Sequence, residues 1–461
     1  MDTIAAIATA PGTAAIGVIR LSGDDAFPLL DRVFFPAGRP MAEQDTRRTV
    51  YGELRSGGGE VIDRCLAVRF AAPASYTGED SAELYCHGGT LVLRLALEAL
   101  FAAGARQAEA GEFTRRAFLN GRMDLTEAEA AADLLSAETE AAVKNAAAQL
   151  GGALRRRVER IYDRLMAVAA RFYAVVDYPD EDIEELEEGE LRNALAFAAA
   201  ELRELLGSFS RGRTLRQGLP TAILGAPNAG KSSLLNALVG YDRAIVTEVA
   251  GTTRDTVEAL AQVGGVPLRL IDTAGIRETE DTVERLGIQR TKQAAAEAEL
   301  LLALIDGSAP PAAEELETAL APLKLAATSG KPWILIQTKC DLGGGFGVLI
   351  DDEGWTQPEA AISLSSVTRE GFDRLEAAIR ALYPPQSAVD ATLLTNPRQA
   401  DAVTRALRAV ERAMAAREAG LTPDAVLTDV EDAISALGEL TGKTLREDLV
   451  HAIFSRFCVG K

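Results

Sequence analysis

The sequence predicts a multidomain protein in which α/β domains are combined with an all-α domain. Its 461 residues are too many for one ordinary hydrophobic core, since a single domain commonly holds about 150 residues. Short apolar runs typical of strands alternate with helical segments in two separate stretches, 1–120 and 213–384. Much of the rest is rich in Ala, Glu, Leu and Arg at helical spacing, with few Gly or Pro.

Residues 1–120 are expected to form an α/β domain. Four short apolar runs predict strands, namely IAAIATA, AIGVIRLSG, RCLAVRF and AELYCHGG, and the segment LVLRLALEALFAAG predicts a helix. The uncharged stretch from Thr3 to Ile19 does not fit a signal peptide, because Asp2 replaces the positive flank and Pro11-Gly12 interrupt the stretch. We expect a buried strand, a turn and a second strand there.

The helical domain is predicted in two halves, residues 121–212 and residues 385–461. Residues 213–384 lie between them and alternate helices with the strands PTAILG, PLRLID, LLLALID, WILIQT and AISLS. This alternation is typical of a parallel sheet covered by helices on both faces. We therefore expect this domain to be inserted between the two halves of one helical domain.

The formal net charge of −20 argues against a protein that coats nucleic acid, because clustered Lys and Arg drive phosphate binding. Any RNA contact must therefore be a local patch. The arginines at 155–157, 160 and 164 are either such a patch or a solvated helix face. No segment reads as a transmembrane helix. The four cysteines lack regular spacing and fit a reducing, cytoplasmic environment: Cys65, Cys86, Cys340 and Cys458.

The segment GAPNAGKS, residues 225–232, follows a predicted strand and opens a helix. This is the arrangement of a P-loop, in which glycines let backbone N–H groups converge on nucleotide phosphates. Lys231 would neutralise phosphate charge, and the Ser232 hydroxyl would ligate Mg²⁺. The alternative, a Gly-rich turn that binds nothing, is disfavoured by the flanking strand and helix. The residues expected at the phosphates are Asn228, Ala229, Gly230, Lys231, Ser232 and Ser233.

Two further segments extend the predicted phosphate site. Asp272-Thr273-Ala274-Gly275 follows the strand PLRLI, where an aspartate can hold the Mg²⁺ shell and the glycine amide can sense a γ-phosphate. The earlier segment GTTRD, residues 251–255, contains Thr253, the candidate second hydroxyl ligand of Mg²⁺. A pair of threonines alone is usually just a polar loop, so this assignment depends on the neighbouring motifs.

The base would be selected by Thr338-Lys339-Cys340-Asp341, at the end of the strand WILIQ. Asp341 can accept two hydrogen bonds from the N–H edge of guanine, which adenine does not offer, while the stem of Lys339 covers the ring. Thr338 replaces the usual Asn, which weakens one supporting contact. Ser365-Ser366 stand where GTPases make a backbone contact to the base. These segments, in this order, are similar to TRAFAC-class GTPases and predict a Ras-like GTPase domain that binds GTP.

One position departs from Ras-like GTPases. The residue after DTAG is Ile276, where those proteins carry a glutamine that positions water. Asn228, together with residues 247–252, resembles the subgroup of GTPases that bind potassium through this asparagine and neighbouring backbone carbonyls. The ion would stabilise the transferring phosphoryl group where an arginine finger otherwise lies. The expected potassium ligands are Asn228, Thr247, Val249 and Thr252.

The flanking sequences resemble those of the MnmE (TrmE) family, which modifies the wobble uridine of tRNA. The resemblance is carried by DTIAAIATAPGTAAIGVIRLSG, PASYTGEDSAELYCHGG, AGEFTRRAFLNGRMDLTEAEAAADLL and the terminal FCVGK. With the GTPase motifs, it covers essentially the whole chain. It implies an N-terminal α/β domain, similar to aminomethyltransferases, that binds formyl- or methylene-tetrahydrofolate as the one-carbon donor.

The resemblance also implies the residues that would hold the folate. They are Arg20, Glu83, Arg122 and Lys461. Arg122 stands where some members have Lys, which keeps the charge but changes the donor geometry. A carboxylate suits a pterin edge and cations suit anionic glutamyl groups, although each residue alone would be taken for a surface charge.

Three residues are expected to be catalytic. Asp272 belongs to the DTAG segment described above. Glu284, in TVERLGIQR, matches the acid that orients water in the family, although a solvated glutamate at a helix start is the alternative. Cys458 matches the cysteine of the modification step, where the thiol could attack a uridine ring or could be an inert packed residue.

The family resemblance implies partners as well. Potassium-dependent members complete their sites when two G domains meet, so a homodimer is expected. The sequence has no dinucleotide fingerprint, and a flavoprotein that uses FAD and NADH, MnmG (GidA), would supply the redox chemistry. Together these features predict potassium-stimulated GTP hydrolysis that supports the addition of a carboxymethylaminomethyl or aminomethyl group to carbon 5 of the wobble uridine.

Two alternatives remain at this point. A ribosome-assembly GTPase of the Era or Der type shares GTTRD and DTAG, but would carry a KH-like RNA-binding domain after the G domain, where this chain continues with helical sequence and CVGK. The second alternative is a switch module that binds partners without modification chemistry.

Overall fold

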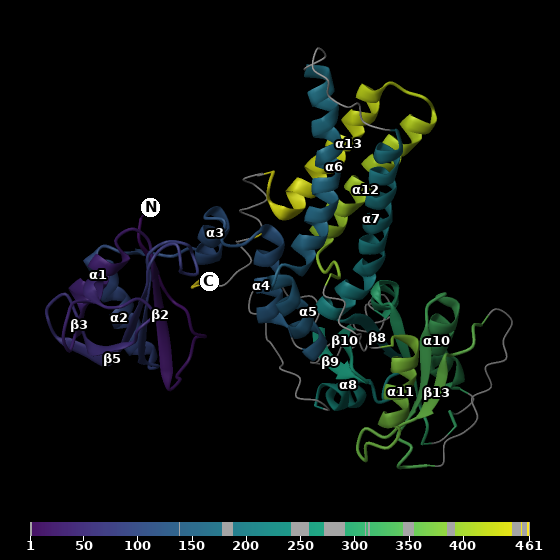
Figure 1. Ribbon diagram of the computed structural model, residues 1–461. Helices are drawn as coiled ribbons and strands as arrows, with labels where there is room; N and C mark the ends of the chain where they lie inside the picture. The colour runs from purple at the N-terminus through teal and green to yellow at the C-terminus, as the bar shows by residue number, and fades with distance from the viewer. Residues whose placement is uncertain are drawn as a thin grey trace. The chain divides into compact units, whose positions relative to one another are not determined.

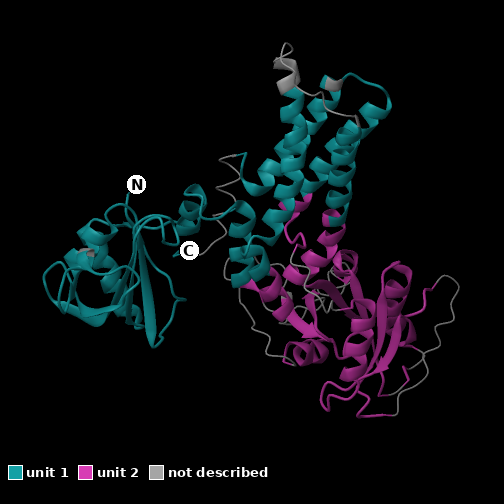
Figure 2. Cartoon of the chain, viewed as in Figure 1, with its two compact units in different colours: residues 1–135, 146–204, 401–461 teal, residues 136–145, 205–400 magenta. Residues whose placement is uncertain are grey.

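The structure of the chain is a computed structural model. It describes residues 2–137, 139–177, 188–240, 258–271, 291–308, 310–311, 314–343, 355–384, 392–444, 453 and 459–460. Both α/β and all-α parts are present, which confirms the predicted fold class in this coarse form. The chain divides into two compact units (Figure 2). Unit 1 holds residues 1–135, 146–204 and 401–461, and unit 2 holds residues 136–145 and 205–400.

Unit 1 begins with a seven-stranded sheet in the order β3-β4-β5-β6-β2-β1-β7. The strands are β1 Ile4–Ile7, β2 Ile16–Ser22, β3 Phe34–Pro36, β4 Val50–Arg55, β5 Val61–Phe70, β6 Ser81–His87 and β7 Arg106–Gln107. The accompanying helices are α1 Ala26–Val33, η1 Met41–Glu43 and α2 Thr90–Ala103. Helices α1 and α2 lie against this sheet (Figure 1). Their buried residues, among them Leu30 and Leu100, form one core with buried sheet residues such as Ile19 and Leu84.

The rest of unit 1 is helical. The helices are α3 Glu112–Leu119, α4 Leu125–Ser136, α5 Glu140–Leu150, α6 Ala153–Asp177, α7 Glu188–Gln217, α12 Pro397–Glu418 and α13 Pro423–Thr441, of which α4, α5, α7 and α12 each also include at least one residue of unit 2. Helix α13 packs against α6, and an ion pair between Arg203 and Glu411 joins α7 to α12 at 2.7 Å. Helices from before and after the middle of the chain therefore pack together, and α7 runs past residue 212, where the sequence suggested a boundary.

None of the helices that the structure describes is both long enough and apolar enough to cross a membrane.

Unit 2 is built on a six-stranded sheet in the order β13-β12-β11-β8-β10-β9. The strands are β8 Leu219–Gly225, β9 Glu258–Val263, β10 Val266–Ile271, β11 Leu300–Asp306, β12 Trp333–Thr338 and β13 Ala360–Ser363, and the helices are α8 Lys231–Val239, α10 Leu316–Thr328 and α11 Phe372–Leu382. Neighbouring strands from β13 to β10 are parallel, and only the edge strand β9 is antiparallel to its neighbour. This parallel arrangement agrees with the one predicted from the alternation of strands and helices in residues 213–384.

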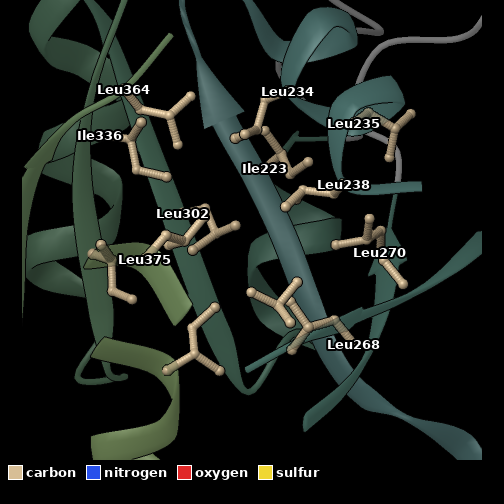
Figure 3. Packing of buried hydrophobic residues seen from close by; sticks show 14 of the residues in the cluster. Ile223, Leu234, Leu235, Leu238, Leu268, Leu270, Leu302, Ile336, Leu364 and Leu375 are labelled. Carbon is tan, nitrogen blue, oxygen red and sulfur yellow. The ribbon is translucent and has the colours of Figure 1, made fainter. Parts of the chain in front are cut away.

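Strand β11 shows how the sheet is buried on both faces. Its successive side chains point to opposite faces, as strand geometry requires. Leu300, Leu302 and Leu304 pack with residues of α8 and α11, which Figure 3 shows for Leu302, Leu234 and Leu375. Leu301, Ala303 and Ile305 pack on the other face with residues of α10 and of the helical segment 291–297.

We expect Leu302→Ala to destabilise unit 2 strongly. Leu302 is fully buried in a central strand, so truncation removes apolar contacts and leaves a cavity that costs about 2–5 kcal/mol. Leu316→Ala is the matched control, because Leu316 is 44% exposed and its loss should cost less than about 0.5 kcal/mol. Urea unfolding followed by tryptophan fluorescence measures this, since Trp333 and Trp355 are the only two tryptophans and both lie in unit 2. Equal losses in the two variants would contradict this packing.

Candidate nucleotide site and N-terminal pocket

Three predicted segments of the nucleotide site follow parallel strands of the unit 2 sheet. Strand β8 ends at Gly225, β12 ends at Thr338 and β13 ends at Ser363. The ladder β8-β11-β12-β13 is parallel throughout, so these three strands end at the same edge of the sheet. Ligands of open α/β sheets bind beyond this carboxyl edge. The fold therefore gathers residues 226–233, 338–341 and 365–366 at one edge.

The P-loop has a folded shape of its own. Asn228 adopts a φ of 61°, and Gly230 adopts a φ of 86° immediately before α8. The Lys231 ammonium donates hydrogen bonds to the carbonyls of Gly225 and Ala226, both at 2.9 Å. This lysine lies at the start of α8, where the first backbone N–H groups of a helix have no partner within the helix and attract anions.

Ser232 and Ser233 lie in the first turn of α8 and are exposed. Asn228 is exposed as well, whereas Ala229 is 2% exposed and packs into the core of unit 2. The loop is thus anchored by its alanine and presents its polar side chains to solvent. These are the positions that the sequence assigned to the phosphates and to Mg²⁺.

Thr338 connects the base-selecting segment to the P-loop. Its hydroxyl lies 2.8 Å from the Ala229 carbonyl and 3.2 Å from the Ile305 carbonyl, and it donates its single proton to this pair of acceptors. The residue is 2% exposed, and a Cβ placed on Gly230 would lie 3.4 Å from its side chain. The sequence analysis expected Thr338, in place of the usual Asn, to weaken one supporting contact. In the structure, the Thr338 hydroxyl supports the P-loop through its bond to the Ala229 carbonyl.

Lys339 is held by an aspartate that the sequence analysis did not single out. Its ammonium lies 2.6 Å from Oδ2 of Asp306, at the end of β11, and the other Asp306 oxygen accepts hydrogen bonds from the Ser308 amide and hydroxyl. Burial raises the pKa of Asp306, but the bonds from Lys339 and Ser308 outweigh it, so the net pKa is lowered. The run LLLALID followed by Gly-Ser was the available sequence signal.

Asp341 and the Ser365-Ser366 pair complete the described part of the nucleotide site. Asp341 is exposed just beyond the end of β12. Ser365 is fully buried, and its hydroxyl accepts hydrogen bonds from the backbone N–H groups of Val367 and Thr368 at 3.2 and 3.1 Å. These bonds fix the loop that carries Ser366.

A second candidate site is a small pocket of about 90 Å³ in the N-terminal part of unit 1. Its lining residues come from β2, β5, β6 and the loop before β6: Arg20, Phe70, Tyr76, Thr77, Ser81 and Glu83. Arg20 and Glu83 face each other in the antiparallel pair of β2 and β6. Their side chains form an ion pair in which Arg20 Nε donates to Glu83 Oε1 at 2.9 Å.

Both charged groups of this pocket are oriented by neighbours. The Arg20 guanidinium lies 5.3 Å from the centre of the Tyr76 ring and 5.8 Å from that of Phe113. The Tyr85 hydroxyl donates to Glu83 Oε2 at 2.7 Å. Burial, and then this carboxylate, raise the pKa of Tyr85 to about 12. The structure thus brings together two of the four residues assigned to folate.

Arg122 lies beside the loop that supplies Tyr76 and Thr77. A Cβ placed on Gly78 of this loop would be 3.2 Å from Arg122 Cγ, and Gly78 has a φ of 80° that favours glycine. The neighbouring Asn120 donates from its side chain to the Thr77 carbonyl at 2.8 Å.

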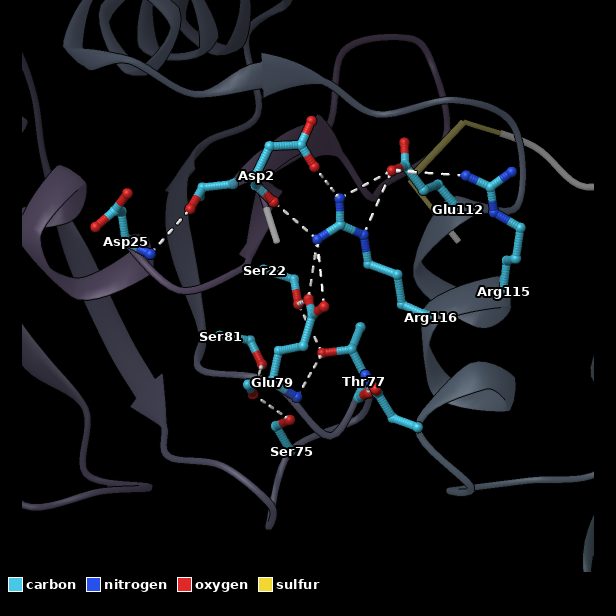
Figure 4. A network of polar contacts seen from close by, with 12 residues as sticks. Asp2, Ser22, Asp25, Ser75, Thr77, Glu79, Ser81, Glu112, Arg115 and Arg116 are labelled. Atoms are coloured by element: carbon cyan, nitrogen blue, oxygen red, sulfur yellow. Dashed lines mark hydrogen bonds and ion pairs between the residues drawn. The ribbon is translucent and has the colours of Figure 1, made fainter.

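A charge network centred on the buried Arg116 bonds to the same loop (Figure 4). The Arg116 guanidinium, 5% exposed, bonds to Glu79 at 3.1 Å, to Glu112 at 2.9 Å and to Asp2 at 2.8 Å. Ser22 in turn bonds to Glu79 and to Thr77. Burial raises the pKa of Glu112, but bonds from Arg106 and Arg116 prevail and lower it to about 2. The sequence analysis missed this network, because its members come from four separate segments.

Comparison with known proteins agrees with this arrangement. Residues 125–458 match the MnmE helical domain, and residues 3–122 match the GTP-binding protein TrmE N-terminus. The tRNA modification GTPase MnmE of Symbiobacterium thermophilum is 44% identical over 463 residues, which span 100% of this chain and 99% of that protein. The chain belongs to the MnmE family. The tRNA modification GTPase MnmE of Roseiflexus castenholzii is 43% identical over 471 residues, with 100% and 99% covered.

Among solved structures, the G domain of the T. maritima FeoB iron transporter is similar to part of this MnmE-family chain. The likeness covers 35% of this chain and 96% of that domain, at 23% identity and a TM-score of 0.25.

Eleven site residues expected in this MnmE-family chain lie outside the described residues. They belong to the segments after α8, after β10 and at the C-terminus, and remain predictions: Thr247, Val249, Thr252, Thr253, Asp272, Thr273, Ala274, Gly275, Glu284, Cys458 and Lys461.

The arginine cluster of this MnmE-family chain is partly used within the protein. Arg157 is 8% exposed and forms ion pairs with Glu201 and Glu204, both at 2.8 Å. Arg155 lies 3.5 Å from Glu127. Arg157 is therefore neither a solvated residue nor a free cation of a phosphate-binding patch, because it is buried and its charge is neutralised within the protein.

The contact of Thr338 with the P-loop predicts a defect in nucleotide binding. Thr338→Val removes the hydroxyl and leaves the buried Ala229 carbonyl without this donor, so we expect affinity for GTP to fall about tenfold. Thr338→Ser keeps the hydroxyl and should bind within about twofold of the original. Titration of a fluorescent guanine nucleotide measures both. Unchanged affinity in the valine variant would show that this hydrogen bond does not support the site.

Proposed function

We propose that this chain is a potassium-stimulated GTPase that, with a flavoprotein partner, adds a carboxymethylaminomethyl or aminomethyl group to carbon 5 of the wobble uridine of certain tRNAs. The one-carbon unit would come from a formyl- or methylene-tetrahydrofolate. As a member of the MnmE family, the chain is a GTP-hydrolysing enzyme of tRNA modification. The observation that carries the proposal is the similarity along the whole chain, joined to a P-loop and a base-selecting segment at one sheet edge.

The residues that the structure describes would bind the guanine base and the phosphates of GTP. Asp341 would accept the two guanine N–H groups, with Lys339 held over the ring by Asp306. Lys231 would exchange its two loop carbonyls for phosphate oxygens, which carry more negative charge. The helix start at Gly230 would direct backbone N–H groups at the phosphates.

The exposed Ser232 hydroxyl fits a Mg²⁺ ligand, because oxygen donors suit this hard cation and Ser232 adjoins the phosphate-binding lysine. Thr253 would be the second hydroxyl ligand, and Asp272 would hold the surrounding water. Magnesium supplies neutralisation of the charge that develops on the phosphate oxygens.

Hydrolysis would depend on two further residues. Asn228, exposed in the P-loop, offers a side-chain oxygen suited to a monovalent cation, with Thr247, Val249 and Thr252 as the other ligands. Potassium supplies positive charge near the transferring phosphoryl group. Glu284 would orient the attacking water, a role that Ile276 cannot fill.

The N-terminal pocket is where the folate would bind. Its oriented Glu83 carboxylate suits the N–H edge of a pterin, and Arg20 with the Tyr76 ring offers a cation and an aromatic face. Arg122 and Lys461 would hold the anionic glutamyl part. The folate supplies the one-carbon unit. Cys458 would act on the uridine ring as a nucleophile.

The remaining partners follow from the chemistry. The flavoprotein MnmG would supply FAD and NADH, since the chain has no dinucleotide fingerprint of its own. A homodimer would let two G domains meet during hydrolysis. We place this work in the cytoplasm, where tRNA is used.

GTP turnover should rise sharply in potassium over sodium, because the ligand set of Asn228 and backbone carbonyls suits the larger ion. Turnover is measured as phosphate release at equal ionic strength in the two salts. We expect Asn228→Ala to abolish the difference while leaving nucleotide affinity nearly intact. Equal turnover of the original protein in the two salts would overturn the potassium assignment.

Two substitutions should separate the two chemistries of the chain. Glu284→Ala should bind GTP but hydrolyse it about 10²-fold or more slowly, because it loses the group that orients water. Cys458→Ser should hydrolyse GTP normally yet fail to modify tRNA. Phosphate release and nucleoside analysis of wobble uridines, in cells that carry each variant, measure the two outcomes.

Either half of this experiment can fail separately. A hydrolysis defect much smaller than about 10²-fold in Glu284→Ala would favour the alternative, in which Glu284 is a solvated glutamate at a helix start. If the Cys458→Ser variant modifies tRNA fully, the thiol has only a structural role, and the remaining role of the tail is to present Lys461 to the folate. Full modification after deletion of the terminal CVGK would favour a switch module over modification chemistry.

A further inference from the structure

Two thiols and one carboxylate meet in the N-terminal sheet of unit 1, apart from the pocket lining. Asp63 and Cys65 belong to β5, and Cys86 belongs to β6. Their ligand atoms, one carboxylate oxygen and two sulfurs, all lie within 4.8 Å of one another. Both cysteines are free and nearly fully buried, and the Asp63 side chain is 9% exposed. Nothing in the nucleotide or folate assignments uses these three side chains.

The sheet register brings the two thiols together. Leu66 of β5 pairs with Tyr85 of β6, so the next residues toward that end of the ladder, Cys65 and Cys86, face each other. The two sulfurs lie within 4.8 Å of each other, and the neighbouring Cys65 thiol, together with burial, raises the pKa of Cys86. A tetrahedral zinc ion with Zn–S bonds of about 2.3 Å separates its two sulfurs by about 3.8 Å, which falls within the 4.8 Å that bounds the ligand atoms here.

Apolar groups close both sides of this thiol pair. Cys65 pairs across the sheet with Gly52 of β4, and Cys86 pairs with Gly17 of β2. A Cβ on Gly52 would meet Phe34, and a Cβ on Gly17 would meet Leu93, so these two side chains fill the space above the glycines. A hydrophobic shell of this kind limits solvent access and strengthens the binding of a cation by charged ligands.

The Asp63 carboxylate is oriented by His87. The His87 backbone N–H donates to Asp63 Oδ2 at 2.8 Å, and the ring Nδ1 lies 2.7 Å from Asp63 Oδ1. Each oxygen retains a second lone pair for a metal ion. Hydrogen bonds from an outer group to a ligating carboxylate are the usual support of a metal site. His87 itself is 75% exposed on its side chain and lies at the solvent side of the cluster.

We propose that Asp63, Cys65 and Cys86 bind one zinc ion, with a fourth position left to a solvent molecule. Thiolate ligands select soft metals such as zinc, and a donor set of sulfur and one oxygen suits its tetrahedral geometry. Two thiolates and a carboxylate carry a charge of −3, which Zn²⁺ reduces to −1, and the two thiol protons leave to water. The ion ties β5 to β6, the strand that also carries Glu83 of the pocket.

Zinc content tests this directly. The full-length chain is incubated with ZnSO₄, passed over a chelating resin that removes loosely held metal, and analysed by elemental mass spectrometry. We expect one zinc per chain in the original protein and in Cys340→Ser, whose cysteine lies in unit 2, and none in Cys65→Ser, Cys86→Ser or Asp63→Asn. Retention of zinc by the Cys65→Ser and Cys86→Ser variants, or its absence from the original protein, would overturn the site.

Cobalt gives a readout that needs no variant to fold. Co²⁺ added to the original chain should produce the near-ultraviolet absorption of thiolate-to-cobalt charge transfer, and excess Zn²⁺ should remove it. Absence of this band would contradict thiolate ligation. A Cys65–Cys86 disulfide found by mass spectrometry of the unreduced chain, in protein that takes up no zinc, would also overturn the proposal and make the pair a cross-strand disulfide.

Discussion

The nucleotide site depends on the parallel hydrogen-bonded ladder that joins β8, β11, β12 and β13. Because these strands run in one direction, the chain segments that follow them emerge at one edge, although the P-loop lies more than a hundred residues before Thr338 in the sequence. One side-chain contact then couples two of them, since the Thr338 hydroxyl bonds to the Ala229 carbonyl of the P-loop. The segments that we propose for phosphate and base recognition are thereby held in a common frame.

The N-terminal pocket depends on an antiparallel register instead. Arg20 and Glu83 face each other across β2 and β6, and the loop that completes the pocket is held by Arg116 and its buried acids. Removing one partner from such a network leaves a buried charge without compensation, which costs more than the net gain from the pair itself. The loop that carries Tyr76 and Thr77 is therefore held by contacts that also compensate the buried Arg116 charge.

Local motifs could be predicted from the sequence, and contacts between distant segments could not. The P-loop, the apolar strands of unit 2 and the antiparallel β1–β2 pair follow from short stretches whose composition determines their conformation. Strand β4 was missed because Val50–Arg55 mixes polar and apolar residues beside glycine. Asp306 was missed because its partner Lys339 lies 33 residues away. Arg116 was missed because its partners Glu79 and Asp2 lie 37 and 114 residues away. The pairing of strands in the fold places such partners together, and no local sequence pattern encodes that pairing.

We propose that the carboxyl edge of the unit 2 sheet selects guanine through Asp341, and the Asp341→Asn variant tests this selection. Equilibrium binding of GTP and xanthosine triphosphate is measured for the original protein and the variant. An amide can donate to the carbonyl that xanthine carries in place of the guanine amino group, whereas a carboxylate repels it. We expect the variant to bind xanthosine triphosphate more tightly than GTP, which reverses the order of the original protein. Unchanged affinity for GTP in the variant would show that the base binds elsewhere.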